Sequence, residues 1–266
     1  WIFPSMRRGG RMLYGIDVTD SAEPVFKWRA GCPNLDNDLD CTTDMEGIGQ
    51  TWSTPSVAFI HGHSRTTPVV VVGGGYDRCE DQNVANPSCD DTKGNFIYIL
   101  NAATGALLRK FETDRAVAAD IAMVDINNDG SPDYAYAADT GGNIYRVDFI
   151  DGPTTKIQRD KDQWTYRKVA ATDPEKNRKF LFAPALLYSQ NKVYVALGSG
   201  DRERPMEDDY PFDNVVNRFY VYVDNLATPA GTGVTPLDAA TVMHYYTTSR
   251  SCTTAPVLPD STRKGW

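Results

Sequence analysis

The chain has 266 residues, of which 41% are hydrophobic, and it carries a formal net charge of −8. This length suits one large all-β domain or two ordinary ones, and the acidic balance argues against nucleic-acid binding, which needs a basic excess. No run of about 18 apolar residues occurs, so the chain is not expected to span a membrane.

We interpret residues 1–266 as a piece of a longer protein. The chain begins at Trp1 with neither a Met nor a signal-like segment, and it stops at Trp266 without a terminating feature. The absence of a signal peptide is therefore uninformative. Near the start, the basic cluster Met6–Arg11 is too short to reverse the acidic balance, and we interpret it as a solvated turn.

Strand signals recur along the whole chain, whereas helical periodicity is nearly absent. Glycine-rich turns such as Gly73–Gly75 separate these signals. Hairpins are expected at Asp17–Asp20 and at Asn101–Gly105, where Gly105 supplies a positive φ. In chain order, the strongest strand signals lie at Met12–Val18, Thr67–Val72, Asn95–Leu100, Ile121–Val124, Tyr134–Ala138, Asn143–Phe149, Lys192–Leu197 and Arg218–Val223.

A local pattern repeats among these strands. The order apolar-Tyr-x-apolar-Asp/Asn occurs at Leu13–Asp17, Ile97–Asn101 and Ile144–Asp148. Short Pro-containing segments, each resembling the start of an inner blade strand, occur at Ser53–Val57, Phe182–Leu186 and Thr254–Leu258.

These repeats predict an all-β protein, a β-propeller with quinoprotein-like blades and long insertions. About four blades are visible, which is too few to close a ring, so the remainder is expected outside the chain. A β-sandwich is the alternative.

The cysteines indicate the compartment. Cys32 and Cys41 flank one acidic loop, and Cys79 and Cys89 flank a second polar loop. Two local disulfides are expected, which implies an oxidising environment, with free thiols as the alternative. A zinc site is disfavoured because the spacings are not CxxC. Cys252 is left over, with a cysteine outside the chain as its candidate partner.

The segment from Asp125 to Asp133 has the spacing of a calcium loop. A glycine at the sixth position, Gly130, permits the sharp turn, and the Ser131 carbonyl at the seventh position can point inward. Calcium takes six to eight hard oxygen ligands, and this spacing wraps such a set around one point. Oxygen-bearing side chains occupy loop positions 1, 3, 5 and 9: Asp125, Asn127, Asp129 and Asp133.

The loop departs from the helical EF-hand. Tyr136 stands where the bidentate Glu is expected, so Asp133 has to take that role, and the flanks are strands, as in integrin-like propellers. The alternatives are an acidic hairpin without metal and, less favoured, a magnesium site. The alternating acids of Asp36–Asp40 lack a following glycine at the sixth position, and we interpret them as a solvated, disulfide-bounded loop.

The chain resembles the PilC/PilY family of type IV pilus tip adhesins. The resemblance covers nearly the whole chain, and the motifs that carry it follow the family's order: Met6–Asp20, Gly49–Pro55, Val70–Asp77, and the calcium loop running into Asp139–Asp148. The resemblance implies a C-terminal propeller whose calcium site, with ligands at Asp125, Asn127, Asp129, the Ser131 carbonyl and Asp133, regulates pilus extension and retraction, twitching motility and attachment.

The same resemblance implies partners and a location. Type IV pilus components, the minor pilins among them, are the expected partners, together with host or abiotic surfaces. The expected location is the pilus tip and the outer-membrane surface, reached by export through the periplasm. The integrin-binding Arg-Gly-Asp motif of some members has no counterpart here, since Gly200–Arg202 reads Gly-Asp-Arg.

Enzymatic alternatives are weaker. The blades also resemble quinoprotein dehydrogenases, which bind pyrroloquinoline quinone beside calcium, but those enzymes commonly carry a vicinal disulfide and the chain has no adjacent cysteines. Hydrolytic chemistry is disfavoured because only His61, His63 and His244 are present and no Gly-x-Ser-x-Gly elbow occurs near them. A metal-independent interaction module is the third alternative. We therefore expect a non-enzymatic calcium-binding module.

Overall fold

The computed structural model describes residues 1–82, 84, 87, 89, 91–201, 215–227 and 233–239. The regular structure within these ranges is almost entirely β, with short 3₁₀ turns at η1 (Arg7–Gly9), η2 (Arg78–Asp81), η3 (Lys161–Gln163) and η4 (Pro174–Lys176). Over this part of the chain, no helix has the length and apolar character needed to cross a membrane.

The strands form four antiparallel sheets, to one of which a short parallel strand is added. The first holds β1 (Arg11–Asp17) and β2 (Val25–Cys32). The second holds β3 (Ser56–Ala58), β4 (Val69–Gly73), β5 (Phe96–Asn101) and β6 (Leu107–Glu112). The third holds β7 (Ala122–Val124), β8 (Tyr134–Ala138), β9 (Asn143–Asp148), β10 (Thr165–Ala171) and β14 (Thr235–Pro236). The fourth holds β11 (Ala185–Ser189), β12 (Lys192–Gly198) and β13 (Phe219–Asn225).

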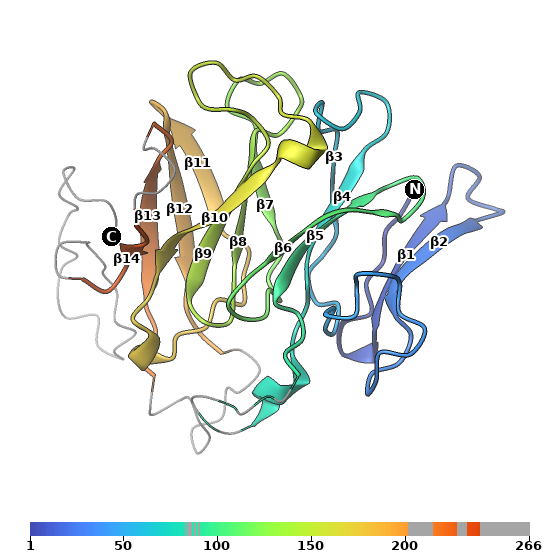
Figure 1. Cartoon of the computed structure of the whole chain (residues 1–266), viewed down its shortest axis with the longest axis horizontal. Coiled ribbons are helices and arrows are strands. Elements are labelled where there is room, and N and C mark those ends of the chain that lie inside the picture. The colour runs from blue at the N-terminus through green and yellow to red at the C-terminus, as the bar shows by residue number, and fades with distance from the viewer. Residues whose placement is uncertain are drawn as a thin grey trace.

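The sheets lie side by side in chain order, from β1–β2 on one side to β11–β13 on the other (Figure 1). This is the arrangement of propeller blades, and within the described residues the blades do not close into a ring. The β-propeller prediction is thus confirmed, and the β-sandwich alternative is wrong. That residues 1–266 as a whole form one β-propeller domain stays a prediction.

The inner strands of the second and third sheets, β4, β5, β8 and β9, are buried on both faces. In β4, Val70 and Val72 pack in the core between the first and second sheets, whereas Val69 and Val71 pack in the core between the second and third. Successive side chains of a strand point to opposite faces, so a strand between two neighbours needs apolar residues at every position. That requirement explains the unbroken apolar run Pro68–Val72.

The predicted strands are confirmed to within a few residues, and two Pro-containing segments begin sheets as expected. Pro55 directly precedes β3 and Pro184 directly precedes β11, because a proline cannot donate to a sheet ladder and suits the edge of a strand. The third segment, Thr254–Leu258, lies outside the described residues, as does Cys252.

The sequence pattern does not predict the strand β10. Its first four residues are exposed or half-buried, and only Val169 and Ala170 are buried. An outer strand with charged residues on its solvent side lacks a clear period of two, so the pattern alone does not reveal it.

The two expected disulfides are present, between Cys32 and Cys41 and between Cys79 and Cys89. The first closes the acidic loop that contains Asp36–Asp40.

The interpretation of the basic cluster Met6–Arg11 as a solvated turn is wrong for Arg11, which is only 3% exposed.

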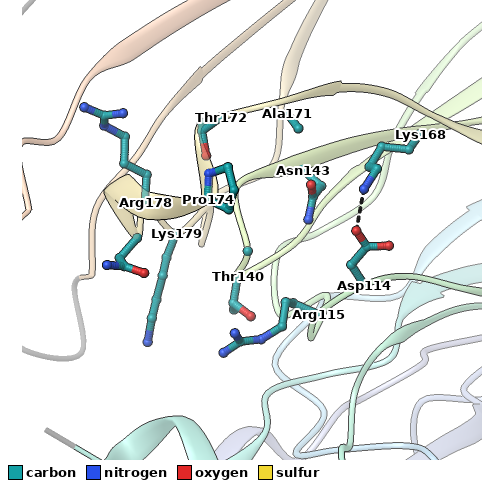
Figure 2. A pocket seen from close by; sticks show the side chains of 12 residues that line it. Asp114, Arg115, Thr140, Asn143, Lys168, Ala171, Thr172, Pro174, Arg178 and Lys179 are labelled. Atoms are coloured by element: carbon teal, nitrogen blue, oxygen red, sulfur yellow. Dashed lines mark hydrogen bonds and ion pairs between the residues drawn. The ribbon is translucent and has the colours of Figure 1, made fainter. Parts of the chain in front are cut away.

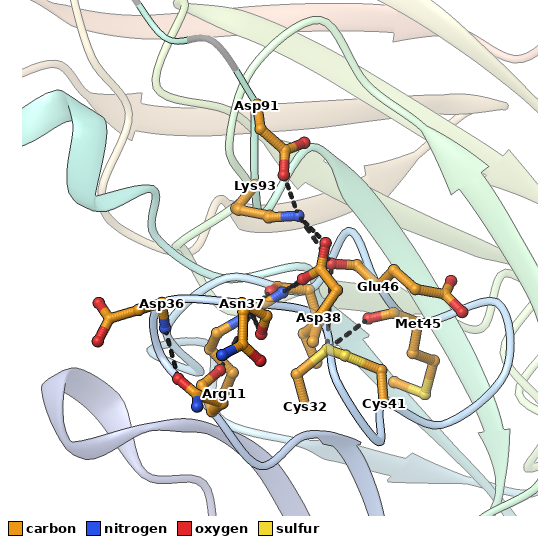
Figure 3. Close-up of polar contacts among 12 residues, drawn as sticks. Arg11, Cys32, Asp36, Asn37, Asp38, Cys41, Met45, Glu46, Asp91 and Lys93 are labelled. Atoms are coloured by element: carbon orange, nitrogen blue, oxygen red, sulfur yellow. Dashed lines mark hydrogen bonds and ion pairs between the residues drawn. A yellow bond between two sulfur atoms is a disulfide. The ribbon is translucent and has the colours of Figure 1, made fainter.

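The acidic loop between Cys32 and Cys41 folds around the side chain of Arg11, a residue of β1 (Figure 3). Its guanidinium donates to the Asp38 carboxylate at 2.7 Å. It also donates to four backbone carbonyls, those of Asn34, Asn37, Glu46 and Ile48, at 2.6–3.1 Å. A planar cation with five N–H donors can satisfy several carbonyls that a short acidic loop would otherwise leave without partners.

The same contacts support the view that this loop holds no second calcium. Asp38 is paired with Arg11 and with Lys93, whose hydrogen bond holds the pKa of Asp38 below its usual value, and Asp36 is paired with Arg78 at 2.6 Å. Cations of the protein already compensate these carboxylates. Ligand atoms of Cys32, Asp38 and Cys41 lie within 4.8 Å of one another, but both sulfurs belong to the disulfide and are not thiolates.

Replacing Arg11 with methionine is expected to lower the free energy of unfolding by about 2 kcal/mol, since buried acceptors lose their donors. The loss stays moderate because Lys93 still compensates Asp38. Denaturant unfolding of the disulfide-intact variant measures it. Arg29→Met, which changes an exposed arginine of β2, is the matched control and should shift unfolding by less than about 0.5 kcal/mol.

Candidate calcium site

The loop from Asp125 to Asp133 joins β7 to β8 in the third sheet. Its two ends are held together by the pair Val124 and Tyr134, and the Asp133 amide donates to the Val124 carbonyl at 2.9 Å. The loop is therefore a hairpin connection between two strands, as the sequence predicted.

Asp125 organises the first half of the loop. Its Oδ1 accepts the backbone N–H groups of Asn127, Asn128 and Asp129 at 3.1, 2.6 and 3.3 Å, and its Oδ2 accepts that of Gly130 at 2.8 Å. Two residues take left-handed backbone conformations, Asn128 at φ +58° and Gly130 at φ +87°. Asparagine and glycine are the residues that tolerate this region, which explains their places in the loop.

The next two ligand candidates make local turns of the same kind. The Asn127 Oδ1 accepts the Asp129 amide at 3.0 Å, and the Asp129 Oδ1 accepts the Ser131 amide at 2.9 Å. Each side-chain oxygen is thereby folded back over the loop. Ser131 is fully buried, and its hydroxyl accepts the backbone N–H of His61, a residue of the second sheet's β3–β4 turn, at 3.0 Å.

Asp133 is the deeply buried member of the set, with no exposed surface. Its Oδ2 accepts the Ile126 amide at 2.8 Å, and its Oδ1 accepts the Gln158 side-chain amide at 3.2 Å. Burial, together with the neighbouring carboxylates of Asp125 and Asp129, raises the pKa of Asp133 to about 6, against the lowering effect of the Ile126 hydrogen bond. A cation at the loop would relieve this cost.

The donor set fits a hard cation in kind. All five predicted ligand residues lie on one short loop, and all offer oxygen. The side chains are not gathered about a common centre, because the carboxylates of Asp125, Asp129 and Asp133 are not among the groups of three whose ligand atoms lie within 4.8 Å of one another. Binding would bring oxygens of these three carboxylates closer together.

Two contacts of the loop were missed from the sequence. His61 lies beside it, with Nδ1 4.0 Å from the Asp129 carboxylate, and Gln158 reaches it from the connection between β9 and β10. The sequence separations are 70 residues for His61 to Ser131 and 25 for Gln158 to Asp133. No local spacing connects residues so far apart.

A separate cavity of about 350 Å³ lies where β9 begins and β10 ends (Figure 2). Its lining is rich in basic side chains, and each of them is paired with a carboxylate: Lys168 with Asp114, Arg115 with Glu80, Lys179 with Glu80 and Asp201, and Arg178 with Asp238. These pairs connect neighbouring loops, so we interpret the cavity as part of a structural ion-pair network.

Comparison with known proteins gives a consistent result. The family model described as the PilY1 beta-propeller domain matches residues 1–174. The type IV pilus biogenesis factor PilY1 of Pseudomonas aeruginosa is 31% identical over 161 residues, which are 59% of this chain and 12% of that protein. The PilY1 homolog of Xylella fastidiosa is 26% identical over 155 residues, 52% of this chain and 9% of that protein. This chain therefore spans a small part of the curated relatives that it matches.

The structural comparison agrees on the fold. The crystal structure of the Pseudomonas aeruginosa PilY1 C-terminal domain superposes with a TM-score of 0.61 and 24% sequence identity, covering 88% of this chain and 47% of that one.

Proposed function

The chain belongs to the PilY1 β-propeller family, and from this we propose that it is a non-enzymatic, calcium-binding module of a type IV pilus protein. Its partners would be pilus components such as minor pilins, and host or abiotic surfaces. It would act outside the cell at the pilus tip, where calcium regulates extension, retraction, twitching motility and attachment.

One observation carries the calcium assignment. The loop between β7 and β8 is folded around the Asp125 carboxylate, which accepts four successive backbone N–H groups, while the buried Asp133 carboxylate closes the other end. Three carboxylates within nine residues repel one another without a cation. Oxygen-only ligands at these positions are the set that calcium prefers.

The position of the loop suggests how the ion could affect the module. Ser131 of the loop contacts His61 of the second sheet, so the loop lies at the junction of two blades. A bound cation would neutralise Asp125, Asp129 and Asp133. It would thereby order this hairpin and the β3–β4 turn that contacts it. An ordered junction would then present a fixed surface to a pilus partner.

A calcium titration tests the proposal. At a calcium concentration one hundred times Kd, binding is expected to stabilise the module by about 2.7 kcal/mol and to raise its melting temperature by about 5–10 °C. The affinity should fall as the pH drops below about 6, where Asp133 takes up a proton, because calcium binds the carboxylate form.

The calcium-free module should show the opposite trend. The folded pKa of Asp133, about 6, lies above its ordinary value of 3.8, so between these values the folded state holds more protons than the unfolded state. Its stability should therefore fall as the pH rises from about 4 to about 6. Absence of both heat and melting shift under millimolar calcium at pH 7.5 would refute the calcium assignment. Magnesium, which demands strict octahedral geometry, is the comparison ion.

The names of the relatives favour a non-enzymatic role over the quinoprotein alternative. Both curated proteins described above are named as pilus biogenesis factors and not as enzymes. Incubation of the chain with pyrroloquinoline quinone and calcium, followed by gel filtration, would separate the two proposals. Quinone absorbance that elutes with the protein would support the enzyme.

A further inference from the structure

We propose that Gln158 is a positioning residue of the calcium site, which holds the Asp133 carboxylate in place so that the other ligands can close around the cation. This inference rests on the proposed function and deepens it. The residue lies outside the loop and outside the spacing that defines the ligands. Its amide nitrogen is 3.2 Å from the Asp133 Oδ1.

The backbone around Gln158 is fixed relative to the loop. The Phe149 amide donates to the Asp133 carbonyl at 3.0 Å, and the Arg159 amide donates to the Phe149 carbonyl at 2.8 Å. Gln158 itself forms a bridge with Ile150. A continuous set of backbone hydrogen bonds thus leads from Asp133 to the segment that carries the Gln158 side chain.

The chemistry of the two groups fixes their orientation. An ionised carboxylate only accepts hydrogen bonds, so the side chain of Gln158 must turn its nitrogen toward Asp133. Its Oε1 is then directed away, where it is buried and has no hydrogen-bond partner among the residues that the structure describes. With Ile126 donating to the other oxygen, the Asp133 carboxylate is held from both ends. Each of its oxygens still keeps a lone pair for a cation.

The segment that carries Gln158 is itself packed against the second sheet. A side chain at Gly62 would come within 1.7 Å of the Arg159 carbonyl, so the turn after β3 lies directly on this backbone. The Trp164 indole donates to the same carbonyl at 3.0 Å, and Trp164 packs edge-on against Phe149 with ring centroids 5.1 Å apart. Gln158 is therefore held by the fold and not by calcium.

The Gln158→Met variant tests the proposal, because methionine keeps the length of the side chain and removes the amide. Calcium binding to the purified chain, measured by titration calorimetry, should weaken about tenfold to a hundredfold, as for other residues that orient metal ligands. The matched control is Gln163→Met, an exposed glutamine of the same connection, which should bind calcium as the wild type does.

A second measurement needs no calcium. The Ile126 amide is protected by its hydrogen bond to Asp133, so loss of the Gln158 contact should speed its hydrogen exchange about tenfold in the metal-free variant, with no change in Gln163→Met. Unchanged Ile126 exchange in Gln158→Met would overturn the inference. If the wild type binds calcium, an equal calcium affinity of Gln158→Met would overturn it too. A wild type that fails to bind calcium would instead refute the proposed function, and the exchange result would still decide the role of Gln158.

Discussion

Replacing Asp133 with asparagine is expected to weaken calcium binding at least a hundredfold while the module stays folded. The variant removes one of the three loop charges and one ligand oxygen at the position that must do the work of the missing bidentate Glu. Both losses act on a site whose affinity depends on the number of charged ligands. Calorimetric titration of the purified chain measures the change.

The fold is expected to tolerate this change for a specific reason. The asparagine oxygen can still accept the Ile126 amide, and a flipped Gln158 amide can accept from the new NH₂ group through its Oε1, which otherwise lacks a partner. The calcium-free variant should also lose the cost of a buried carboxylate whose pKa is raised to about 6. Its melting temperature at pH 7.5 without calcium should therefore equal or exceed that of the wild type.

A charge-matched control separates the ligand effect from a general loss of negative charge. Glu23→Gln removes one exposed carboxylate far from the loop in sequence and should leave calcium affinity unchanged.

In the producing organism, the full-length protein with Asp133→Asn should alter the calcium dependence of surface piliation and twitching. If the variant binds calcium as tightly as the wild type, Asp133 is not a ligand.

Replacing Arg146 with methionine is expected to lower the free energy of unfolding by about 3–5 kcal/mol, because it leaves a buried carboxylate without its cation. Arg146 lies on β9 and is 3% exposed. Its guanidinium donates to Asp148 of the same strand at 2.9 Å and to Asp224 of β13 at 2.8 Å. It also stacks on the Tyr134 ring, with the guanidinium carbon 4.9 Å from the ring centroid.

This cluster ties the third sheet to the fourth. Asp224 is also only 3% exposed, and it accepts the Tyr136 hydroxyl at 2.8 Å. Burial alone would lower the pKa of Arg146, but the hydrogen bonds and charges of Asp148 and Asp224 outweigh it and hold that pKa above its usual value. The arginine therefore stays charged, and a methionine in its place removes the compensation for Asp224.

Chemical denaturation of the single and double variants tests this account. Arg146→Met combined with Asp224→Asn should recover part of the lost stability, because the uncompensated carboxylate is gone. A loss below about 1 kcal/mol in the single variant, or no recovery in the double variant, would show that the two charges are not coupled across the blade junction.

Features that depend on residues close together in the chain could be predicted from the sequence. Alternation and turn chemistry located strands such as Tyr134–Ala138, whose observed bounds are the same. The spacing from Asp125 to Asp133 predicted which oxygens share one loop, since a candidate ligand set within nine residues is arranged largely by its own backbone. The cysteine positions around two short loops likewise identified both disulfides.

The contacts between distant segments could not be predicted in this way. In the sequence, Arg11 is one basic residue of a basic cluster. In the structure, the segment after Cys32 folds around it and supplies four carbonyls. Gln158 and His61 have no pattern linking them to the loop from Asp125 to Asp133, because their contacts depend on which blades become neighbours. The physical reason is that a hydrogen bond requires an approach of about 3 Å. Between residues tens of positions apart, the packing of the sheets sets that approach.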